Sequence, residues 1–516
     1  MAANFKETIQ AGYTHKGESI LLGAAMLNGV ADKTCLVSLP LKTFNRHGLI
    51  AGATGTGKTK TLQLIAESLS KKSVPVLVMD IKGDLSGIAA KGSVNERITE
   101  RYQQLGLSYE TDSSPVEFLT LNKGIGTQLK ATVSEFGPVL LSKILDLNET
   151  QGGFVAMIFK YCDDKQLPLL DLKDFIKVLQ FISNEGKTEM EKDYGKISTT
   201  STGTILRKVI ELQQQGADTL FGEPSFDVED LIRMDDRGRG IVSVLRLNDL
   251  QDKPKLFSTF MLCLLAELYA KLPEEGDLDQ PKLVLFIDEA HLIFNEASEA
   301  LLDQIETIIK LIRSKGVGIF FVTQNPTDVP AAVLSQLGLK VQHALRAFTA
   351  ADRKSIKQSA ENFPESEFYQ VDELLTQLGM GEALVTGLNE KGIPTPLAAT
   401  LLCAPSSRMD VLGDTELDTI VKQSKIAAKY NQELDSVSAY ELLNAKLQKA
   451  AVSTEELQDE TPKQGSKKYE KSTLEEILSS PVTKQVARTA TAALIRGLLG
   501  ALGLSGGSRS KKNSWF

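Results

Sequence analysis

The segment GATGTGKT at residues 52–59 constrains this chain more than any other part of its sequence. It satisfies the pattern G-x-x-x-x-G-K-[ST], and it lies between a short apolar run at 47–51 and an amphipathic stretch at about 58–70. Glycines let the backbone N–H groups of such a loop turn inward, and the helix that follows adds the positive end of its dipole. The segment therefore predicts a phosphate-binding loop between a strand and a helix.

The residue types of this loop indicate the ligand. Lys58 can reach the β- and γ-phosphates of ATP, and the hydroxyl of Thr59 can bind Mg²⁺. The alternative is a turn rich in Gly and Thr that matches the pattern by chance, which the flanking strand and helix disfavour. The candidate nucleotide-binding residues are Gly52, Ala53, Thr54, Gly55, Thr56, Gly57, Lys58, Thr59 and Lys60.

A second motif ends in two carboxylates. Residues 283–291 read LVLFIDEAH, an apolar strand that finishes at Asp288 and Glu289. The first acid at such a strand end holds Mg²⁺ in phosphate-loop ATPases, and an adjacent acid can act as the general base for the attacking water. The alternative is a buried strand capped by solvated acids. Two interpretations of His291 remain open, which are coupling to this site and plain packing.

Several further residues are candidates for completing the site. Gln324 follows the next apolar run, at 318–323, where it could sense the γ-phosphate; the alternative is a turn residue that caps a helix. Arg313 and Arg346 are candidates for an arginine that a neighbouring subunit supplies, and the alternative is a surface or structural ion pair for each. Asp80 and Asp84 either order water near the nucleotide or simply form a turn.

The order of predicted elements indicates an α/β fold with a mainly parallel sheet covered on both faces, because buried apolar strands alternate with amphipathic helices. Helical periodicity replaces this alternation across the middle of the chain. We expect a short N-terminal β region at 1–46, the core at 47–125 and 240–403, an all-helical insertion at 126–239, and a helical C-terminal region at 404–516.

The C-terminal region contains a solvated stretch near 455–472 and then an amphipathic to apolar helix at 482–504. This helix carries Lys484, Arg488 and Arg496, a composition that suits a protein partner or a membrane surface. The alternative is a helix that packs on its own protein. We expect it to contribute to partner binding.

Composition bounds the compartment and the partners. Four scattered cysteines fit a reducing compartment, and the N-terminus lacks the apolar region of a secretory signal. No run of 18 apolar residues occurs, so no membrane span is expected. These features favour a cytoplasmic protein. The net charge of −8 disfavours a general nucleic-acid coat, although a ring can confine positive charge to its pore.

The motifs together resemble a known family. GLIAGATGTGKT, LFIDEAH and IRSKGVGIFFVTQNPTDVPAAVLSQLG look like the HerA-like branch of the HerA/FtsK ATPases. The segments LNETQGGFVAMIFK and KVQHALRAFTAADRK make the fuller pattern similar to bacterial YjgR-type proteins. The resemblance covers nearly the whole chain.

The resemblance implies a RecA-like core, hydrolysis with an additional catalytic glutamate, and hexameric rings with nucleotide between subunits. It assigns the phosphate lysine to Lys58, the metal ligands to Thr59 and Asp288, the base to Glu289 and the polar sensor to Gln324. The arginine that acts in trans is Arg313 or Arg346, with Arg313 narrowly favoured. Archaeal HerA has a larger N-terminal barrel, so the barrel expected here is reduced.

Three functions follow as hypotheses. The first is an ATP-driven hexameric motor with DNA as its track. The second is a nucleotide-regulated assembly protein that switches partner binding and moves nothing, which the absence of a dense basic stripe in the sequence keeps open. The third, a small-molecule phosphotransferase, is disfavoured because adjacent acids suit the activation of water.

Overall fold

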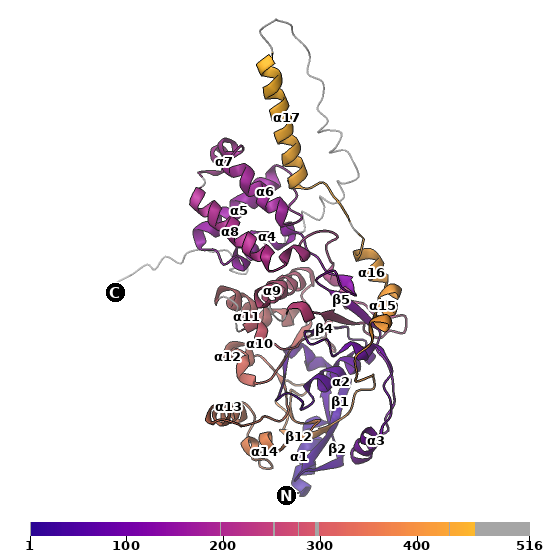
Figure 1. Cartoon of the computed structure of the whole chain (residues 1–516). Coiled ribbons are helices and arrows are strands. Elements are labelled where there is room, and N and C mark those ends of the chain that lie inside the picture. The colour runs from indigo at the N-terminus through magenta and orange to yellow at the C-terminus, as the bar shows by residue number, and fades with distance from the viewer. Residues whose placement is uncertain are drawn as a thin grey trace, which may run out of the picture. The chain divides into compact units, whose positions relative to one another are not determined.

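A computed structural model describes residues 2–196, 198–250, 253–276, 278–294, 299–432 and 434–459. The chain divides into two compact units (Figure 1). Unit 1 comprises residues 1–129 and 226–431, and unit 2 comprises residues 130–225 and 432–516. The predicted helical tail at 482–504 and most of the linker before it lie outside the described residues.

Unit 1 is built on a 12-stranded sheet in the order β2-β1-β12-β11-β10-β3-β9-β8-β4-β7-β5-β6. The strands from β10 to β6 run parallel, and β2, β1, β12 and β11 extend the sheet with antiparallel pairs. This confirms the α/β fold with a mainly parallel sheet. The strands are β1 Ser19–Leu27, β2 Val30–Pro40, β3 Gly48–Ala51, β4 Val76–Asp80, β5 Val116–Thr120, β6 Thr127–Gln128, β7 Val242–Arg246, β8 Leu283–Ile287, β9 Val317–Thr323, β10 Leu339–Gln342, β11 Glu382–Thr386 and β12 Ala398–Leu402.

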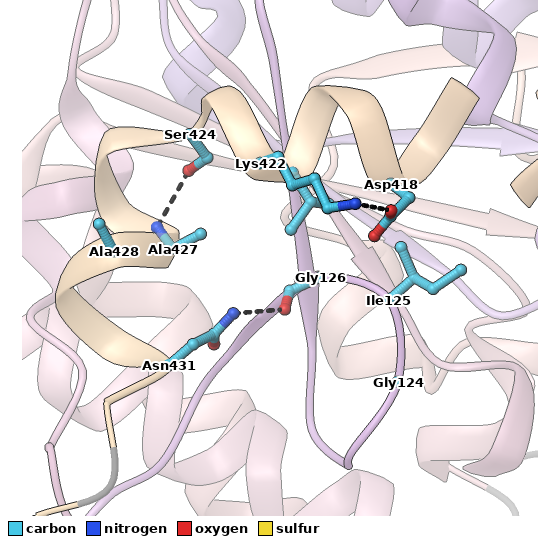
Figure 2. Close-up of a pocket in the computed structure, with 10 residues that line it drawn as sticks. Gly124, Ile125, Gly126, Asp418, Lys422, Ser424, Ala427, Ala428 and Asn431 are labelled. Atoms are coloured by element: carbon cyan, nitrogen blue, oxygen red, sulfur yellow. Dashed lines mark hydrogen bonds and ion pairs between the residues drawn. The ribbon is translucent and has the colours of Figure 1, made fainter. Parts of the chain in front are cut away.

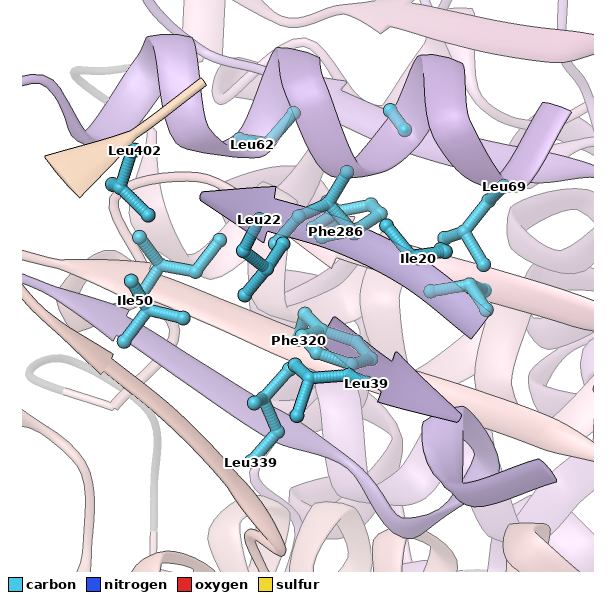
Figure 3. Close-up of a cluster of buried hydrophobic side chains, with 14 of the residues drawn as sticks. Ile20, Leu22, Leu39, Ile50, Leu62, Leu69, Phe286, Phe320, Leu339 and Leu402 are labelled. Carbon is cyan, nitrogen blue, oxygen red and sulfur yellow. The ribbon is translucent and has the colours of Figure 1, made fainter. Parts of the chain in front are cut away.

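The central strands are apolar throughout because both faces of the sheet are covered. Every residue of β3, β4, β8 and β9 is buried. On one face, Leu62 and Leu69 of helix α2 (Lys58–Lys71) pack against Ile50, Phe286 and Phe320 (Figure 3). The core cluster continues from there to the antiparallel strands, so the sheet forms one body with its N-terminal hairpin.

The helices of unit 1 follow the strands in alternation. The longer ones are α1 Ala2–Tyr13, α2 Lys58–Lys71, α3 Glu96–Leu105, α9 Pro254–Lys271, α11 Glu299–Ile312, α13 Ala350–Glu361, α14 Val371–Gln377, α15 Asp414–Gln423 and α16 Lys425–Tyr430. Two four-residue helices, α10 His291–Phe294 and α12 Ala331–Leu334, and several 3₁₀ turns complete the unit.

The N-terminal region differs from the reduced barrel expected at residues 1–46. It begins with helix α1, which buries Phe5, Ile9 and Tyr13 at a spacing of four residues. The hairpin of β1 and β2 then pairs with β12 and joins the main sheet. The tyrosine hydroxyl of Tyr13 donates to the carbonyl of Pro396 at 2.6 Å, which ties the helix to the sheet edge.

Unit 2 is helical where it is described. Its helices are α4 Val133–Ile144, α5 Glu149–Asp164, α6 Leu172–Ser183, α7 Lys187–Tyr194, α8 Thr199–Gln214 and α17 Ala439–Asp459. Capping boxes at Thr132, Asn148 and Asp171 fix the starts of three of them. Helix α17 packs on α6, and the hydroxyl of Ser438 donates to Asp174 at 2.5 Å. The unit therefore takes in sequence from beyond 404 and ends its inserted part at residue 225.

Strand β10 ends at Gln342 and does not continue to Ala347. The carbonyl of Ala344 instead accepts a hydrogen bond from the backbone of Ala53, which takes the chain out of the sheet. Within the described residues, no helix is long and apolar enough to cross a membrane.

Candidate functional site

The loop at residues 52–57 lies at the carboxyl end of β3, between β10 and β9. Three backbone hydrogen bonds anchor it to segments far along the chain. Gly52 N donates to the carbonyl of Thr323 at 3.3 Å, and Ala53 N donates to that of Ala344 at 2.8 Å. The carbonyl of Thr56 accepts from Gly381 N at 3.1 Å. The loop is thus held by three neighbouring connections of the sheet.

Two glycines of the loop meet real conformational demands. Gly52 has φ +152°, and a Cβ there would lie 2.5 Å from the Cβ of His343. Gly57, the residue before helix α2, has φ +114°, which an L side chain rarely adopts. The first N–H groups of α2 lack intrahelical partners because of their position in the helix. The loop and helix start together form a concave set of donors suited to phosphate.

Lys58 places its ammonium inside this loop. Its side-chain Nζ donates to the carbonyl of Gly52 at 2.6 Å, and the residue is 7% exposed. Burial lowers the pKa of Lys58, and the nearby charge of Lys82 lowers it further, while the carboxylates of Glu289 and Asp288 oppose both effects. A phosphate group here would favour the charged ammonium and oppose this lowering of the pKa of Lys58.

The acids that follow β4 are close to Thr59. The hydroxyl of Thr59 donates to Asp84 Oδ2 at 3.4 Å. Asp80 is 1% exposed, and its two oxygens accept from the backbone N–H groups of Gly83, Asp84 and Leu85. Burial raises the pKa of Asp80 to about 6. Asp80 therefore shapes the turn, and Asp84 is the acid that this turn presents to the loop.

Asp288 and Glu289 follow β8, two strands from β3 in the sheet. They are 3% and 5% exposed. Burial raises the pKa of Asp288 to about 7, and the negative charge of Glu289 adds to the rise. Glu289 also has φ +47°, an uncommon backbone conformation for a residue with a Cβ. Burial of two adjacent acids in a strained turn is expensive, which is the usual mark of a functional site.

Two cationic or ionisable neighbours contact Glu289. Lys82 Nζ forms an ion pair with Glu289 Oε1, and His291 Nδ1 lies 3.1 Å from Glu289 Oε2. Burial tends to lower the pKa of Lys82, but the hydrogen bond and charge of Glu289 outweigh it and leave that pKa raised. The glutamate is therefore held between two side chains. No sequence motif singles out Lys82, because its partner lies far along the chain.

The donor set fits a divalent cation. Carboxylate oxygens of Asp80, Asp84 and Asp288 all lie within 4.8 Å of one another. Asp84 Oδ1 and Asp288 Oδ2 are buried and accept no hydrogen bond from the described residues. Hard oxygen ligands of this kind suit Mg²⁺. The oxygen atoms of Thr59, Asp84 and Asp288 therefore fit a divalent cation. Asp84 adds to the two ligands that were expected from the sequence.

Gln324 lies at the same edge of the sheet. It follows Thr323, the residue whose carbonyl accepts from Gly52 N, and its side chain is exposed. The turn after it is fixed because Asp328 Oδ2 accepts from the hydroxyl of Thr323 at 2.6 Å and from Asn325 N at 3.0 Å. Gln324 is thus next to the phosphate loop but is not engaged by this turn.

The two candidate arginines lie at opposite ends of the sheet. Arg346 is exposed on the segment after β10, two residues beyond the anchor at Ala344. Arg313 lies in a 3₁₀ turn before β9, just after α11 ends at Ile312. Strand β9 has seven residues, so at about 3.3 Å each it separates Arg313 from the loop of its own chain by roughly 20 Å.

His343 was not singled out by the sequence motifs, and no local signal marks it. It is fully buried, and its Nε2 lies 2.9 Å from the hydroxyl of Thr61 in α2. Burial lowers the pKa of His343 to about 4, and the charge of Lys58 adds to this. A neutral imidazole therefore packs behind the phosphate loop and supports it.

A separate pocket of about 400 Å³ lies beside the turn at 124–126 and the helices α15 and α16 (Figure 2). Asn431 Nδ2 donates to the carbonyl of Gly126 at 3.1 Å, and Lys422 pairs with Asp418 at 2.5 Å across its rim. It shares no residue with the phosphate loop or with the acids, so the candidate site above does not extend into it.

Comparison with known proteins identifies relatives of this chain. The family model described as "Helicase HerA-like C-terminal" matches residues 26–509. Two similar proteins are named DNA double-strand break repair helicase HerA. The one from Saccharolobus solfataricus is 22% identical over 71% of this chain and 66% of its own length. The one from Sulfurisphaera tokodaii is 24% identical over 68% of this chain and 64% of its own length.

Among solved structures, the bacterial conjugative coupling protein TrwB in its unbound form is similar in fold. It has 13% sequence identity and a TM-score of 0.51, over 79% of this chain and 94% of that one. This likeness concerns the fold of the α/β core. The matches to the HerA proteins span about two thirds of their length.

Proposed function

Because this chain belongs to the HerA-like helicase C-terminal family, we propose that it hydrolyses ATP and uses the energy to move along DNA as a ring, most simply a hexamer. One observation carries the proposal. The phosphate loop with Lys58 and the buried pair of Asp288 and Glu289 meet at one edge of the sheet. This arrangement suits phosphoryl transfer to water.

Nucleotide binding is assigned to the loop. The backbone N–H groups at residues 52–59 and the ammonium of Lys58 bind the phosphates, and the helix dipole of α2 favours their charge. Thr59, Asp84 and Asp288 would hold Mg²⁺, which would neutralise charge on the phosphate oxygens. Because burial raises the pKa of Asp288, a bound cation would stabilise the ionised form of this carboxyl group.

Hydrolysis is assigned to Glu289. A water molecule attacks the γ-phosphorus, and Glu289 accepts a proton from that water as the new P–O bond forms. The bond between the γ-phosphorus and the bridging oxygen breaks, and ADP leaves with the electron pair. Lys82 forms an ion pair with Glu289 and orients its carboxylate. Gln324 is the candidate sensor of the γ-phosphate beside the loop.

The position of the arginines supports a ring. Arg313 lies at the far end of its own sheet, so it can approach a γ-phosphate only in a neighbouring chain. Arg346 lies beside the phosphate loop of its own chain and is the second candidate. A site completed by a neighbour requires an oligomer, and the closed form of repeated head-to-tail contacts is a ring.

DNA is proposed as the track because the similar HerA proteins are named DNA double-strand break repair helicases. The alternative is a nucleotide-regulated switch that assembles with a partner and moves nothing. The overall charge of −8 favours that alternative in part, since it disfavours general attraction to polyanions.

Stimulation of ATP hydrolysis by DNA separates the two functions. We expect duplex or single-stranded DNA to raise the ATPase rate of the wild-type protein. Glu289→Gln should bind ATP and fail to hydrolyse it with or without DNA, because Asp288 and Lys58 remain. A wild-type rate that no DNA changes would contradict the motor and favour the switch, and a fully active Glu289→Gln would contradict the assignment of the base.

A further inference from the structure

The segment after β10 exposes an unusual set of side chains beside the phosphate loop. It leaves the sheet at His343 and leads through residues 344–349 into helix α13, Ala350–Glu361, which packs on α14 (Figure 1). Helix α13 buries Ile356 and Ser359 on one side. The opposite side faces solvent.

That solvent-facing side is cationic. Arg353, Lys354 and Lys357 are all exposed, and their spacing of one, three and four residues places them on one face of the helix. None of the three makes an ion pair with a carboxylate of the described residues. The chain as a whole is acidic, with a net charge of −8, so this face of α13 is locally positive in contrast to the rest of the chain.

An aromatic ring stands at the start of the same helix. Phe348 is 87% exposed, the highest exposed fraction among the large apolar side chains of the described residues. Its backbone N–H donates to Asp352 Oδ2 at 2.9 Å, and Thr349 caps the helix, so the position of Phe348 is fixed. An apolar residue at this position usually packs on the fourth helical residue, but here that residue is Arg353.

Hydrogen bonds and packing connect the segment that precedes α13 to the nucleotide site. The carbonyl of Ala344 accepts from Ala53 N of the phosphate loop at 2.8 Å, and His343 packs against Gly52 and Thr61. Leu345 N donates to the carbonyl of Leu375 at 2.8 Å, which fixes the segment to α14. The short segment at 344–352 therefore connects the phosphate loop to the exposed cations.

We propose that the cationic face of α13, formed by Arg353, Lys354 and Lys357 with Phe348 at its start, binds DNA. The cations contact the sugar–phosphate backbone, and the ring of Phe348 stacks on an unpaired base. The proposal rests on the proposed function, because it names the part of the motor that holds its track. Movement of the phosphate loop reaches this face through residues 343–349.

The first experiment measures the salt dependence of DNA binding. Affinity for labelled duplex is determined by fluorescence anisotropy between about 50 and 200 mM salt, with a non-hydrolysable ATP analogue present. The triple variant R353Q/K354Q/K357Q should lower the slope of log affinity against log salt by about 2.7, or about 0.9 for each lost phosphate contact. If the triple variant does not fold, each single substitution should lower it by about 0.9.

The matched control removes the same charge elsewhere. Lys33, Lys391 and Lys425 are exposed and make no ion pair with the described residues, and they lie on other parts of unit 1. K33Q/K391Q/K425Q should leave the slope unchanged. Binding of a fluorescent ATP analogue reports that the fold and the loop remain intact in both variants. Arg346 is left unchanged because it is a candidate at the nucleotide site.

The second experiment tests the aromatic side chain of Phe348. Phe348→Ala should weaken binding of single-stranded DNA roughly 5-fold or more, with a smaller effect on duplex, because stacking needs an unpaired base. Phe348→Trp should retain the affinity. Equal loss in both variants, or equal loss for duplex and single strands, would contradict the stacking role.

The outcomes separate this inference from the proposed function. If wild-type protein binds DNA and the triple variant binds it with the same slope, the inference is wrong and the motor stands. If wild-type protein binds no DNA, both are wrong. If the triple variant changes the oligomeric state in light scattering while its DNA contacts per chain persist, the face is a contact between subunits, which also overturns the inference.

Discussion

Lys82 is the counter-charge of the buried acids, and its removal should destabilise the nucleotide-free protein. Lys82 forms an ion pair with Glu289, whose side chain is 6% exposed, and its charge also lowers the pKa of Asp288. Lys82→Met keeps much of the side-chain volume and removes only the charge. Glu289 then remains buried beside Asp288 with His291 as its nearest ionisable contact.

The magnitude follows from the exposure of the two partners. Removal of one partner from a fully buried ion pair costs about 3–5 kcal/mol. The Lys82 side chain is 39% exposed, so solvent screening reduces the expected loss to about 1–2 kcal/mol. The loss should grow with pH. Asp288 has a pKa of about 7 in the folded protein and about 3.9 when unfolded, so its ionisation removes stability as the pH rises through this interval.

The assay is denaturant unfolding at about pH 6 and about pH 8, which lie on either side of the pKa of Asp288. We expect Lys82→Met to lose more stability at the higher pH. Saturating Mg²⁺ and ADP should narrow the difference, because the bound cation supplies the missing charge. The control is Lys310→Met, whose partner Glu306 lies 3.7 Å away on the surface, and we expect a change within about 0.5 kcal/mol.

A clear result would refute this reasoning. If Lys82→Met unfolds at the wild-type midpoint at the higher pH without Mg²⁺ and nucleotide, Lys82 does not neutralise the acid pair. A loss that is equal at both pH values would mean that Lys82 acts through its ion pair with Glu289 or through packing, and not through the charge of Asp288.

Two further predictions concern the arginine and the loop. Arg313→Ala and Lys58→Ala subunits should each lack ATPase activity, and mixing them should restore part of it if Arg313 acts in trans; no recovery in rings shown to be mixed would remove that role, and recovery with Arg346→Ala would transfer it. Gly52→Ala should abolish binding of fluorescent ADP, because its Cβ would lie 2.5 Å from that of His343. Gly55→Ala meets no atom within 4 Å and should cost only about 1–2 kcal/mol of backbone strain in a thermal melt; similar nucleotide affinity in the two variants would contradict the packing argument.

The parts of the fold that sequence could predict are those with one uninterrupted physical signal. Strands β8 and β9 are wholly apolar because both of their faces are buried. Strand β5 gives no such signal, because its buried Glu117 interrupts the apolar run, and that glutamate pairs with Arg233 at 3.1 Å. Strand β12, with the sequence AATLL, has one β-branched residue, Thr400, and no aromatic residue, so it carries little of the composition that marks strands.

The same distinction applies to the site. Lys58, Thr59, Asp288 and Glu289 lie in two local motifs, and the structure brings both motifs to one edge of the sheet. Lys82 and His343 contribute through partners distant in sequence, so no local pattern could assign them. Arg313 lies in a well-marked segment, but its distance from the loop of its own chain follows only from the direction of β9.

The position of β3 in the sheet determines when a newly synthesised chain can first bind ATP. Strand β3 is made early in synthesis, yet both of its neighbours, β9 and β10, come more than 250 residues later in the chain (317−51 = 266). The three anchors of the phosphate loop, at Thr323, Ala344 and Gly381, lie at the end of β9 or beyond it. Contacts of such long sequence separation form slowly, because the chain between them must first be closed. A nascent chain on the ribosome therefore carries a complete nucleotide motif that has no strand beside it, and the ability to bind ATP should appear only when nearly the whole of unit 1 has emerged.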